Sequence, residues 1–149
     1  MAETRTAHLR SQRQKAIQEA IDALYAARTS GDSQEFASYF SVDARMVIVG
    51  NPAMSPGSGM RMGREGIARH IDMLHEINEY LGYTIDHVVI DGDHVVVRWT
   101  AEVRFLDSGR TGSFEVLDHL QIRDGMIVEM THFYDTGGMG IIRGRIKIA

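Results

Sequence analysis

The sequence predicts an α+β fold in which helices pack against one face of a curved, mostly antiparallel sheet. Apolar side chains recur at helical spacing in residues 7–27 and again in residues 64–80. From residue 83 to residue 135 the pattern changes to alternating apolar and polar side chains, interrupted by short turns rich in Asp and Gly. Helices followed by a run of hairpins favour an α+β domain, because each layer then covers the apolar face of the other.

Three helices and one strand are expected in the first 80 residues. The first helix, residues 7–27, is followed by a short second helix with Asp32 or Ser33 at its N-cap. Residues 44–50 predict a strand, and the Pro- and Gly-rich residues 51–63 predict an irregular loop before the third helix.

Four strands are expected after residue 82. The second of them has a wholly apolar row, which we predict faces the helices: Val95, Val97, Trp99, Ala101, Val103 and Phe105. Phe105 and Phe114 are expected on one face although their numbers differ by an odd count, so a β-bulge is predicted near residues 106–112.

The turn between the last two strands decides whether Asp118 and His132 share a face. A two-residue Asp124–Gly125 turn would pair Arg123 with Met126 and place the two side chains on opposite faces. A three-residue turn places His132 diagonally from Asp118, roughly 7–8 Å away between Cα atoms. This second register agrees with the apolar pattern, and we therefore predict it.

Asp118 interrupts an otherwise apolar row of its strand. A buried charge without a partner is costly, so such a residue is usually neutralised, hydrogen-bonded or used in chemistry. An apolar cavity should raise the pKa of Asp118 above its ordinary value of roughly 3.9 and favour a protonated donor, unless a charged His132 pairs with it. Either state suits acid/base chemistry, and a pair that only satisfies its own hydrogen bonds is the structural alternative.

The candidate catalytic residues are therefore Asp118 and His132, with Tyr25 or Tyr134 assisting. The candidate ligand-binding residues share an apolar or aromatic side chain on the predicted inner face. They are Met46, Ile48, Trp99, Val103, Phe105, Phe114, Val116, Met130 and Tyr134.

Composition argues against several classes of function. The 149 residues predict one domain, and a net charge of −4 provides no basic surface for nucleic acid. No apolar run approaches the roughly 20 residues of a membrane span, and a polar start without cysteine is typical of a cytoplasmic protein. No cofactor or metal is expected, since residues 57–63 lack the dinucleotide-binding spacing and His70 and His75 do not share a helix face.

The order of elements, with FASYFSVDA, MGREGIARHIDML and RDGMIVEMTHFYDT at the expected places, resembles the nuclear transport factor 2-like superfamily, and in particular its SnoaL-like and ketosteroid isomerase-like members. The resemblance covers about residues 10–137 and leaves a tail at 138–149. It implies a cone-shaped α+β barrel, in which a curved, mostly antiparallel sheet wraps around three N-terminal helices and a cavity accepts an apolar ring compound.

The resemblance also implies a homodimer and a role for Asp118. The dimer would form through the outer face of the sheet, where Leu117, Ile127 and Phe133 are expected. Asp118 aligns with the aspartic acid that stays protonated in ketosteroid isomerase and donates a hydrogen bond to the dienolate oxygen. Ile48 stands near the position of that enzyme's general base, so the known residues of the isomerase are not all present.

Three functions are consistent with the sequence. The first is an isomerase or cyclase without cofactor, in which Asp118 and His132 perform acid/base chemistry on an apolar ring substrate. The second is a non-catalytic binding module for an apolar ligand. The third is a structural dimerisation domain with a filled cone, which would follow if Trp99 and Met130 closed the cavity.

Overall fold

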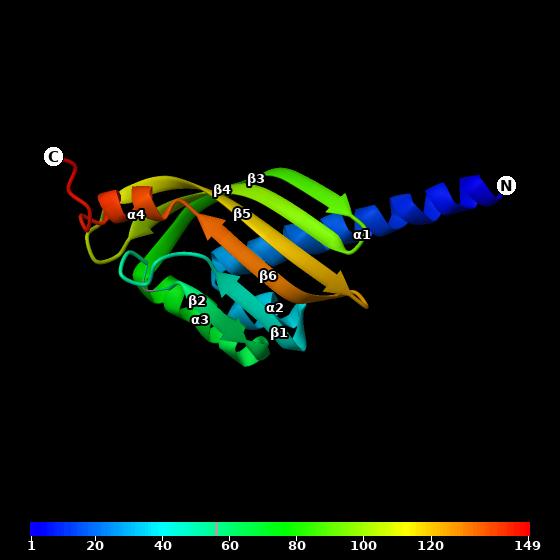
Figure 1. The fold of residues 1–149 in the computed structure, drawn as a ribbon, viewed down its shortest axis with the longest axis horizontal. Coiled ribbons are helices and arrows are strands. Elements are labelled where there is room, and N and C mark those ends of the chain that lie inside the picture. Colours follow the sequence, from blue (N-terminus) through cyan, green and yellow to red (C-terminus); the bar gives the residue numbers. More distant parts are fainter. Residues whose placement is uncertain (56) are drawn as a thin grey trace.

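The computed structural model describes residues 1–55 and 57–149, with the backbone alone at Ala2. Helices and strands follow in the order α1 (Ala2–Ser30), α2 (Ser33–Ser38), β1 (Phe40–Ile48), β2 (Gly59–Met62), α3 (Gly63–Ile77), β3 (Asn78–Asp91), β4 (His94–Phe105), β5 (Thr111–Arg123), β6 (Met126–Tyr134) and α4 (Thr136–Ile142) (Figure 1). Among the described helices, none is both long enough and apolar enough to cross a bilayer.

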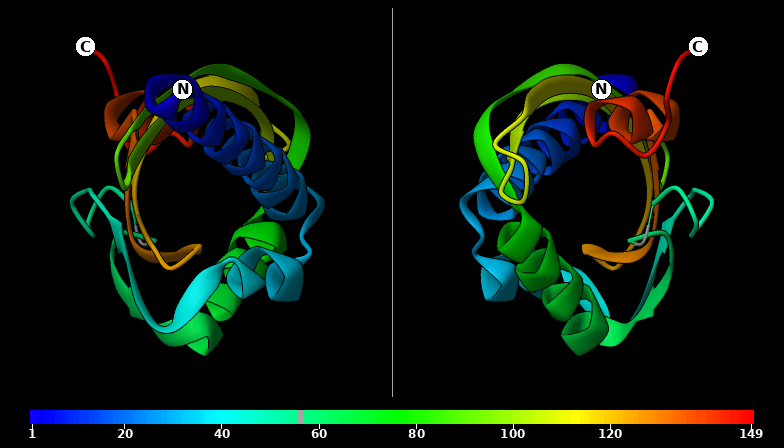
Figure 2. Two further views of the ribbon diagram at one scale, coloured as in Figure 1. Left: turned by 90° about the vertical axis from the view of Figure 1, so that its right-hand side faces the viewer. Right: turned by 90° about the vertical axis from the view of Figure 1, so that its left-hand side faces the viewer.

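The six strands form one curved sheet in the order β2-β1-β6-β5-β4-β3. All neighbouring strands are antiparallel except β1 and β6, which are parallel. The sheet does not close on itself, and helices α1, α2 and α3 complete the ring on its concave side (Figure 2). The predicted α+β cone with a mostly antiparallel sheet around three N-terminal helices is therefore confirmed.

The N-terminal helix is longer than its apolar pattern predicts. Its buried stripe starts at Ile17, and the exposed residues before it carry the helix beyond the sheet (Figure 1). Gly31 ends the helix in the left-handed conformation at φ 83°, which glycine adopts at low cost. The side chain of Asp32 then accepts a hydrogen bond from the Glu35 backbone and caps α2, as predicted.

The inner row of β4 is buried as its alternation predicts, with every member from Val95 to Phe105 at most 5% exposed. Several boundaries differ from the prediction, and β1 already begins at Phe40 instead of residue 44. Residues 59–62 form the edge strand β2 instead of loop, residues 78–80 belong to β3 instead of the third helix, and α4 occupies the start of the tail. Pairing with β1 extends the sheet to β2, and pairing with β4 extends β3 back to Asn78, while the side chain of Asp135 caps α4.

The predicted register of the last hairpin is wrong. Asp124 and Gly125 form a two-residue turn with φ of 51° and 75°, and Arg123 pairs with Met126. The register shifts beyond Ile122, so that Gln121 pairs with Glu129 and Asp118 lies directly opposite His132. Without this bulge the two-residue turn would place Asp118 and His132 on opposite faces, and with it they share the inner face. The bulge also places Ile127 in the core, although it was expected on the outer face.

The bulge predicted between β4 and β5 is absent from residues 94–123, all of which are described. The Phe105 N–H donates to the Arg110 carbonyl at 2.8 Å, and the ladder then continues in one register from Arg104 and Thr111. A four-residue loop therefore brings Phe105 and Phe114 to one face, because directly paired residues point to the same side of a sheet.

Candidate functional site

A cavity of about 370 Å³ lies between the concave face of the sheet and helices α1 and α3. Small-molecule sites typically start at about 300 Å³, so the volume suits a ligand of modest size. The helix α4 contributes Met139, and the following Arg143 also lines the cavity. Trp99 forms part of the wall of this cavity, whereas Met130 does not line it.

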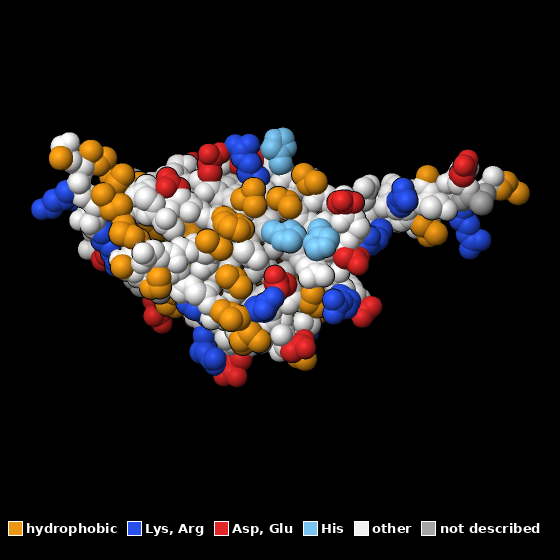
Figure 3. Space-filling model, in the orientation of Figure 1, with side chains coloured by type: hydrophobic (Ala, Val, Ile, Leu, Met, Phe, Trp, Pro, Cys, Tyr) orange, Lys and Arg blue, Asp and Glu red, His pale blue; other side chains and the backbone are white. Residues whose placement is uncertain are grey.

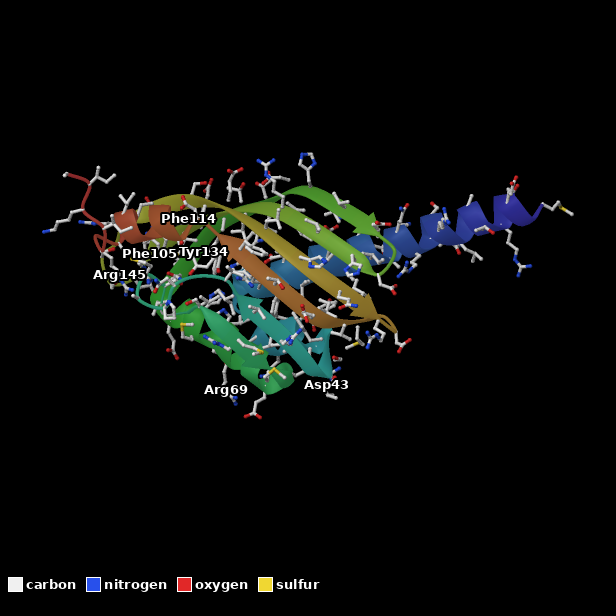
Figure 4. The ribbon with its side chains drawn as sticks, in the orientation of Figure 1. Asp43, Arg69, Phe105, Phe114, Tyr134 and Arg145 are labelled. Carbon is white, nitrogen blue, oxygen red and sulfur yellow. The ribbon has the colours of Figure 1, made fainter. Side chains whose placement is uncertain are left out.

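Six of the nine predicted ligand-binding residues line this cavity: Ile48, Trp99, Val103, Phe114, Val116 and Tyr134. The other three, Met46, Phe105 and Met130, have no exposed surface and do not line it. Phe105 packs against Phe114 with ring centroids 5.9 Å apart, and the Arg143 guanidinium carbon lies 4.5 Å from its ring centroid. Phe105, Phe114 and Tyr134 lie together at the end of the molecule where α4 begins (Figure 4).

Asp118 is fully buried behind the cavity wall and accepts three hydrogen bonds. The Tyr25 hydroxyl donates to Oδ2 at 2.5 Å, and the Trp99 indole donates to the same oxygen at 2.8 Å. The other oxygen, Oδ1, lies 2.5 Å from Nδ1 of His132. Tyr25 and Asp118 do not line the cavity, whereas His132 does. The structure thus brings the three candidate catalytic residues together but presents only one of them to a ligand.

The hydrogen bonds favour an ionised Asp118 next to a neutral His132. Burial opposes the charge of Asp118, but the attraction of a protonated His132, the hydrogen bond from its ring, the positive charge of Arg28 and the Tyr25 hydrogen bond outweigh burial and hold the pKa of Asp118 below its ordinary value. The last three remain when His132 is neutral. Burial lowers the pKa of His132, Asp118 counteracts this, and Arg28 lowers the pKa further. The protonated Asp118 expected from an apolar site is therefore not the state that this environment favours.

This arrangement fixes which nitrogen of His132 carries the proton. Three donors around one carboxylate leave Nδ1–H of the imidazole as the donor to Oδ1, and Nε2 is then an acceptor, with Nη2 of Arg28 3.5 Å away on the donor side. Burial also keeps the pKa of Tyr25 well above its ordinary value, so its hydroxyl remains a donor. Asp118 and Tyr25 thus form the buried part of this network, and of the three residues only His132 lines the cavity.

The sequence reasoning missed two buried basic side chains of the cavity wall, Arg28 and His70, which are 2% and 3% exposed. Burial, followed by the positive charges of Arg28 and Arg61, lowers the pKa of His70 to about 3, so its ring is neutral at neutral pH. Arg28 falls on the apolar stripe of Ile17, Ile21 and Leu24, in the same way that Asp118 interrupts an apolar row. A charged residue on the apolar stripe of a helix was thus the sequence feature that could have identified Arg28.

A catalytic metal is not indicated by the described side chains, since they contain no group of three or more His, Asp or Glu placed to hold an ion. The paired histidines His94 and His119 lie on the outer side of β4 and β5, with ring nitrogens 3.0 Å apart. The site is therefore built from protein acid/base groups around an apolar volume.

An open sheet curved around three helices, with its cavity on the concave side, defines an α+β cone of the nuclear transport factor 2-like type. A family model described as SnoaL-like domain matches residues 21–130. The chain belongs to this SnoaL-like family. Among curated proteins, none matches the sequence.

Solved structures show the same fold at low sequence identity. A candidate isomerase from Bacillus subtilis superimposes with a TM-score of 0.78 at 14% identity, covering 91% of this chain and 97% of its own. A protein of ketosteroid isomerase-like fold from Catenulispora acidiphila, in complex with trimethylamine, has a TM-score of 0.74 at 20% identity, with 85% and 92% covered. TsrD from Streptomyces laurentii has a TM-score of 0.73 at 24% identity, with 89% and 97% covered.

Proposed function

We propose that this chain binds a small, largely apolar molecule in the cavity and moves a proton on it, in the manner of an isomerase or a cyclase. The observation that carries the proposal is the position of His132. Its Nδ1 is held by the buried carboxylate of Asp118 at 2.5 Å, and the ring lines a cavity whose walls are mainly apolar. A neutral histidine oriented in this way is a general base at neutral pH.

The chemistry follows from the unprotonated Nε2 of His132, which a ligand reaches by displacing the long contact to Nη2 of Arg28 at 3.5 Å. Nε2 of His132 accepts a proton from a carbon next to a carbonyl group, and the imidazolium that forms is stabilised by the negative charge of Asp118. The same proton returns to a different carbon in an isomerisation. In a cyclisation the carbanion attacks a second carbonyl carbon of the same molecule, and the imidazolium returns its proton to the alkoxide oxygen that forms. This mechanism differs from the sequence-based hypothesis, because Asp118 supports His132 from behind and does not itself donate to the substrate oxygen.

Solvent exchange tests the proposal without knowledge of the natural substrate. A set of enolisable ring ketones is incubated in heavy water with the protein, and deuterium incorporation next to the carbonyl is measured by NMR. We expect incorporation by the wild-type protein and none above background with His132→Gln. Tyr39→Phe, which removes a surface hydroxyl bonded to Glu35, is the control and should behave as the wild type.

Two results would contradict this account. Deuterium incorporation that survives His132→Gln would remove the proposed base. Ligand binding without exchange into any ketone would instead identify a binding module, which is the alternative function. Because the pKa of His132 is lowered, exchange should persist below about pH 6.5, where an ordinary histidine becomes protonated.

We further propose that two chains pair through the outer face of the sheet. Leu117 and Phe133 are directly paired across β5 and β6, and 40% and 44% of their surfaces are exposed. Val89 on β3 is 59% exposed, and hydrophobic side chains are spread over this face between the charged groups (Figure 3). Sedimentation analysis should give a dimer for the wild type and a monomer for Phe133→Glu, and a monomeric wild type would contradict the proposal.

A further inference from the structure

Arg28 is a buried cation with no carboxylate partner among the described residues. It lies in the last turn of α1, is 2% exposed and lines the cavity. Its Nε and Nη1 have no hydrogen-bond partner, and its Nη2 lies 3.5 Å from Nε2 of His132. The guanidinium carbon lies 5.4 Å from the ring centroid of Trp99 and 5.8 Å from that of Phe36. Aromatic rings stabilise the charge in part but leave the N–H donors of Nε and Nη1 unused.

The cavity around Arg28 is positively charged. Arg61 and Arg143 also line it, and none of the Asp or Glu side chains that the structure describes does so. The nitrogens of Arg61 bond to backbone carbonyls, and those of Arg143 reach only the amide oxygen of Asn78 at 3.3 Å. On the surface, by contrast, several arginines are neutralised by ion pairs with carboxylates. They are Arg13, Arg45, Arg69, Arg98 and Arg104.

This charge distribution is unusual for a chain of net charge −4. A buried guanidinium whose Nε and Nη1 lack acceptors is unfavourable unless something compensates it. Asp118 attracts the charge without contacting it, and a ligand that supplies a negative charge would also fill the empty donor positions. A carboxylate matches a guanidinium particularly well, since it offers two acceptor oxygens in a plane. The apolar walls at Trp99, Val103 and Phe114 would meanwhile contact an uncharged ring or chain.

We propose that the natural ligand is an apolar carboxylic acid, bound as its carboxylate by Arg28 with Arg61 and Arg143 adding positive potential. This inference rests on the proposed function and specifies its substrate class. Because the Arg28 guanidinium lies beside Nε2 of His132, a carboxylate on Arg28 would place the adjacent carbons of the ligand next to the base. The proton that His132 moves then belongs to a carbon that lies close to the carboxylate and next to a separate carbonyl group of the ligand.

Matched probes test the charge requirement directly. Phenylacetate, hydrocinnamate and naphthylacetate are each compared with the uncharged amide of the same shape by isothermal titration calorimetry. Trp99 is the only tryptophan of the chain and lines the cavity, so its fluorescence reports binding at this site independently. We expect at least one carboxylate to bind tenfold or more tightly than its amide, which is the order of a charge-assisted hydrogen bond.

Variants then assign the preference to Arg28. Arg28→Met keeps the length of the side chain and should reduce carboxylate affinity to that of the amide, and Arg28→Lys should retain part of the preference. Arg45→Met, which removes a surface arginine paired with Glu129, is the matched control and should keep the full preference. If Arg28→Met does not fold, the Arg28 Nε–H resonance of the wild type should shift with carboxylate and not with amide.

The inference is overturned if no carboxylate binds more tightly than its amide, or if the preference survives Arg28→Met. Its failure can be separated from failure of the proposed function. His132→Gln should lose deuterium exchange while the carboxylate preference persists. Exchange into neutral ketones together with equal binding of acid and amide would retain the function of His132 and reject the anionic ligand.

Discussion

The buried histidine His70 should make the protein less stable in mild acid, and its removal should reduce this effect. The ring is 3% exposed, its Nδ1 has no hydrogen-bond partner, and its pKa is lowered to about 3. In the unfolded chain the pKa of histidine is about 6.5. Between these two values the unfolded state binds a proton that the folded state does not, so the free energy of unfolding falls as the pH falls.

The size of the effect follows from the two pKa values. Each pH unit within the window costs about 1.4 kcal/mol, so lowering the pH from about 6.5 to 5 removes about 2 kcal/mol. The contribution is fully present above about pH 6.5 and is lost progressively as the pH falls toward about 3, the pKa of the folded state. The lowered pKa values of Asp118 and His132 act in the same direction.

Urea unfolding followed by Trp99 fluorescence measures this difference. The free energy of unfolding is determined near pH 7 and near pH 5 for the wild type and for His70→Gln, which cannot titrate. Between pH 7 and pH 5, the free energy of unfolding should fall by about 2 kcal/mol more in the wild type than in His70→Gln. Equal losses in both proteins would refute the reasoning, because His70 would then be protonated in the folded state as readily as in the unfolded one.

Three other substitutions test the hydrogen bonds of Asp118, the cavity and helix α4. Tyr25→Phe removes a donor from the ionised Asp118 and should lower the free energy of unfolding by about 1–3 kcal/mol in urea titrations; no loss would contradict the hydrogen bond. Ala101→Leu fills cavity space and should weaken calorimetric binding of hydrocinnamate at least tenfold with little change in Tm, so unchanged affinity would place the ligand elsewhere. Asp135→Ala removes the N-cap of α4 and should destabilise this helix by about 1 kcal/mol. Amide hydrogen exchange should then be faster in residues 136–142 alone, and faster exchange throughout the chain would indicate a wider role for Asp135.

The helical layer and the sheet of this fold are predictable because each contains a long segment with a clear apolar period. The apolar row of β4 and the stripe of α1 both face the core as expected. The β5–β6 register was not predictable in detail, since a two-residue turn with a bulge and a three-residue turn place the same side chains on the same face. Only the backbone conformation of Asp124 and Gly125 distinguishes them.

The site was predictable in part, because its polar residues interrupt the same kind of periodic apolar segment. Asp118 and His132 are conspicuous as polar residues in apolar rows, and the structure joins them at 2.5 Å. Their protonation was not predictable, because it depends on the donors Tyr25 and Trp99, which come from other elements. Arg28 was overlooked because a basic residue near a helix C-terminus is usually explained by the helix dipole. Its burial against Trp99 is a tertiary feature.

The central claim is that His132 presents an unprotonated Nε2 to the cavity while Asp118 holds its Nδ1. The most direct measurement is the nitrogen NMR spectrum of the His132 ring at neutral pH, assigned with His132→Gln. The account predicts a neutral ring with its proton on Nδ1, and an Nε2 signal that shifts when a ligand enters the cavity. A proton on Nε2, or a doubly protonated ring at neutral pH, would contradict it.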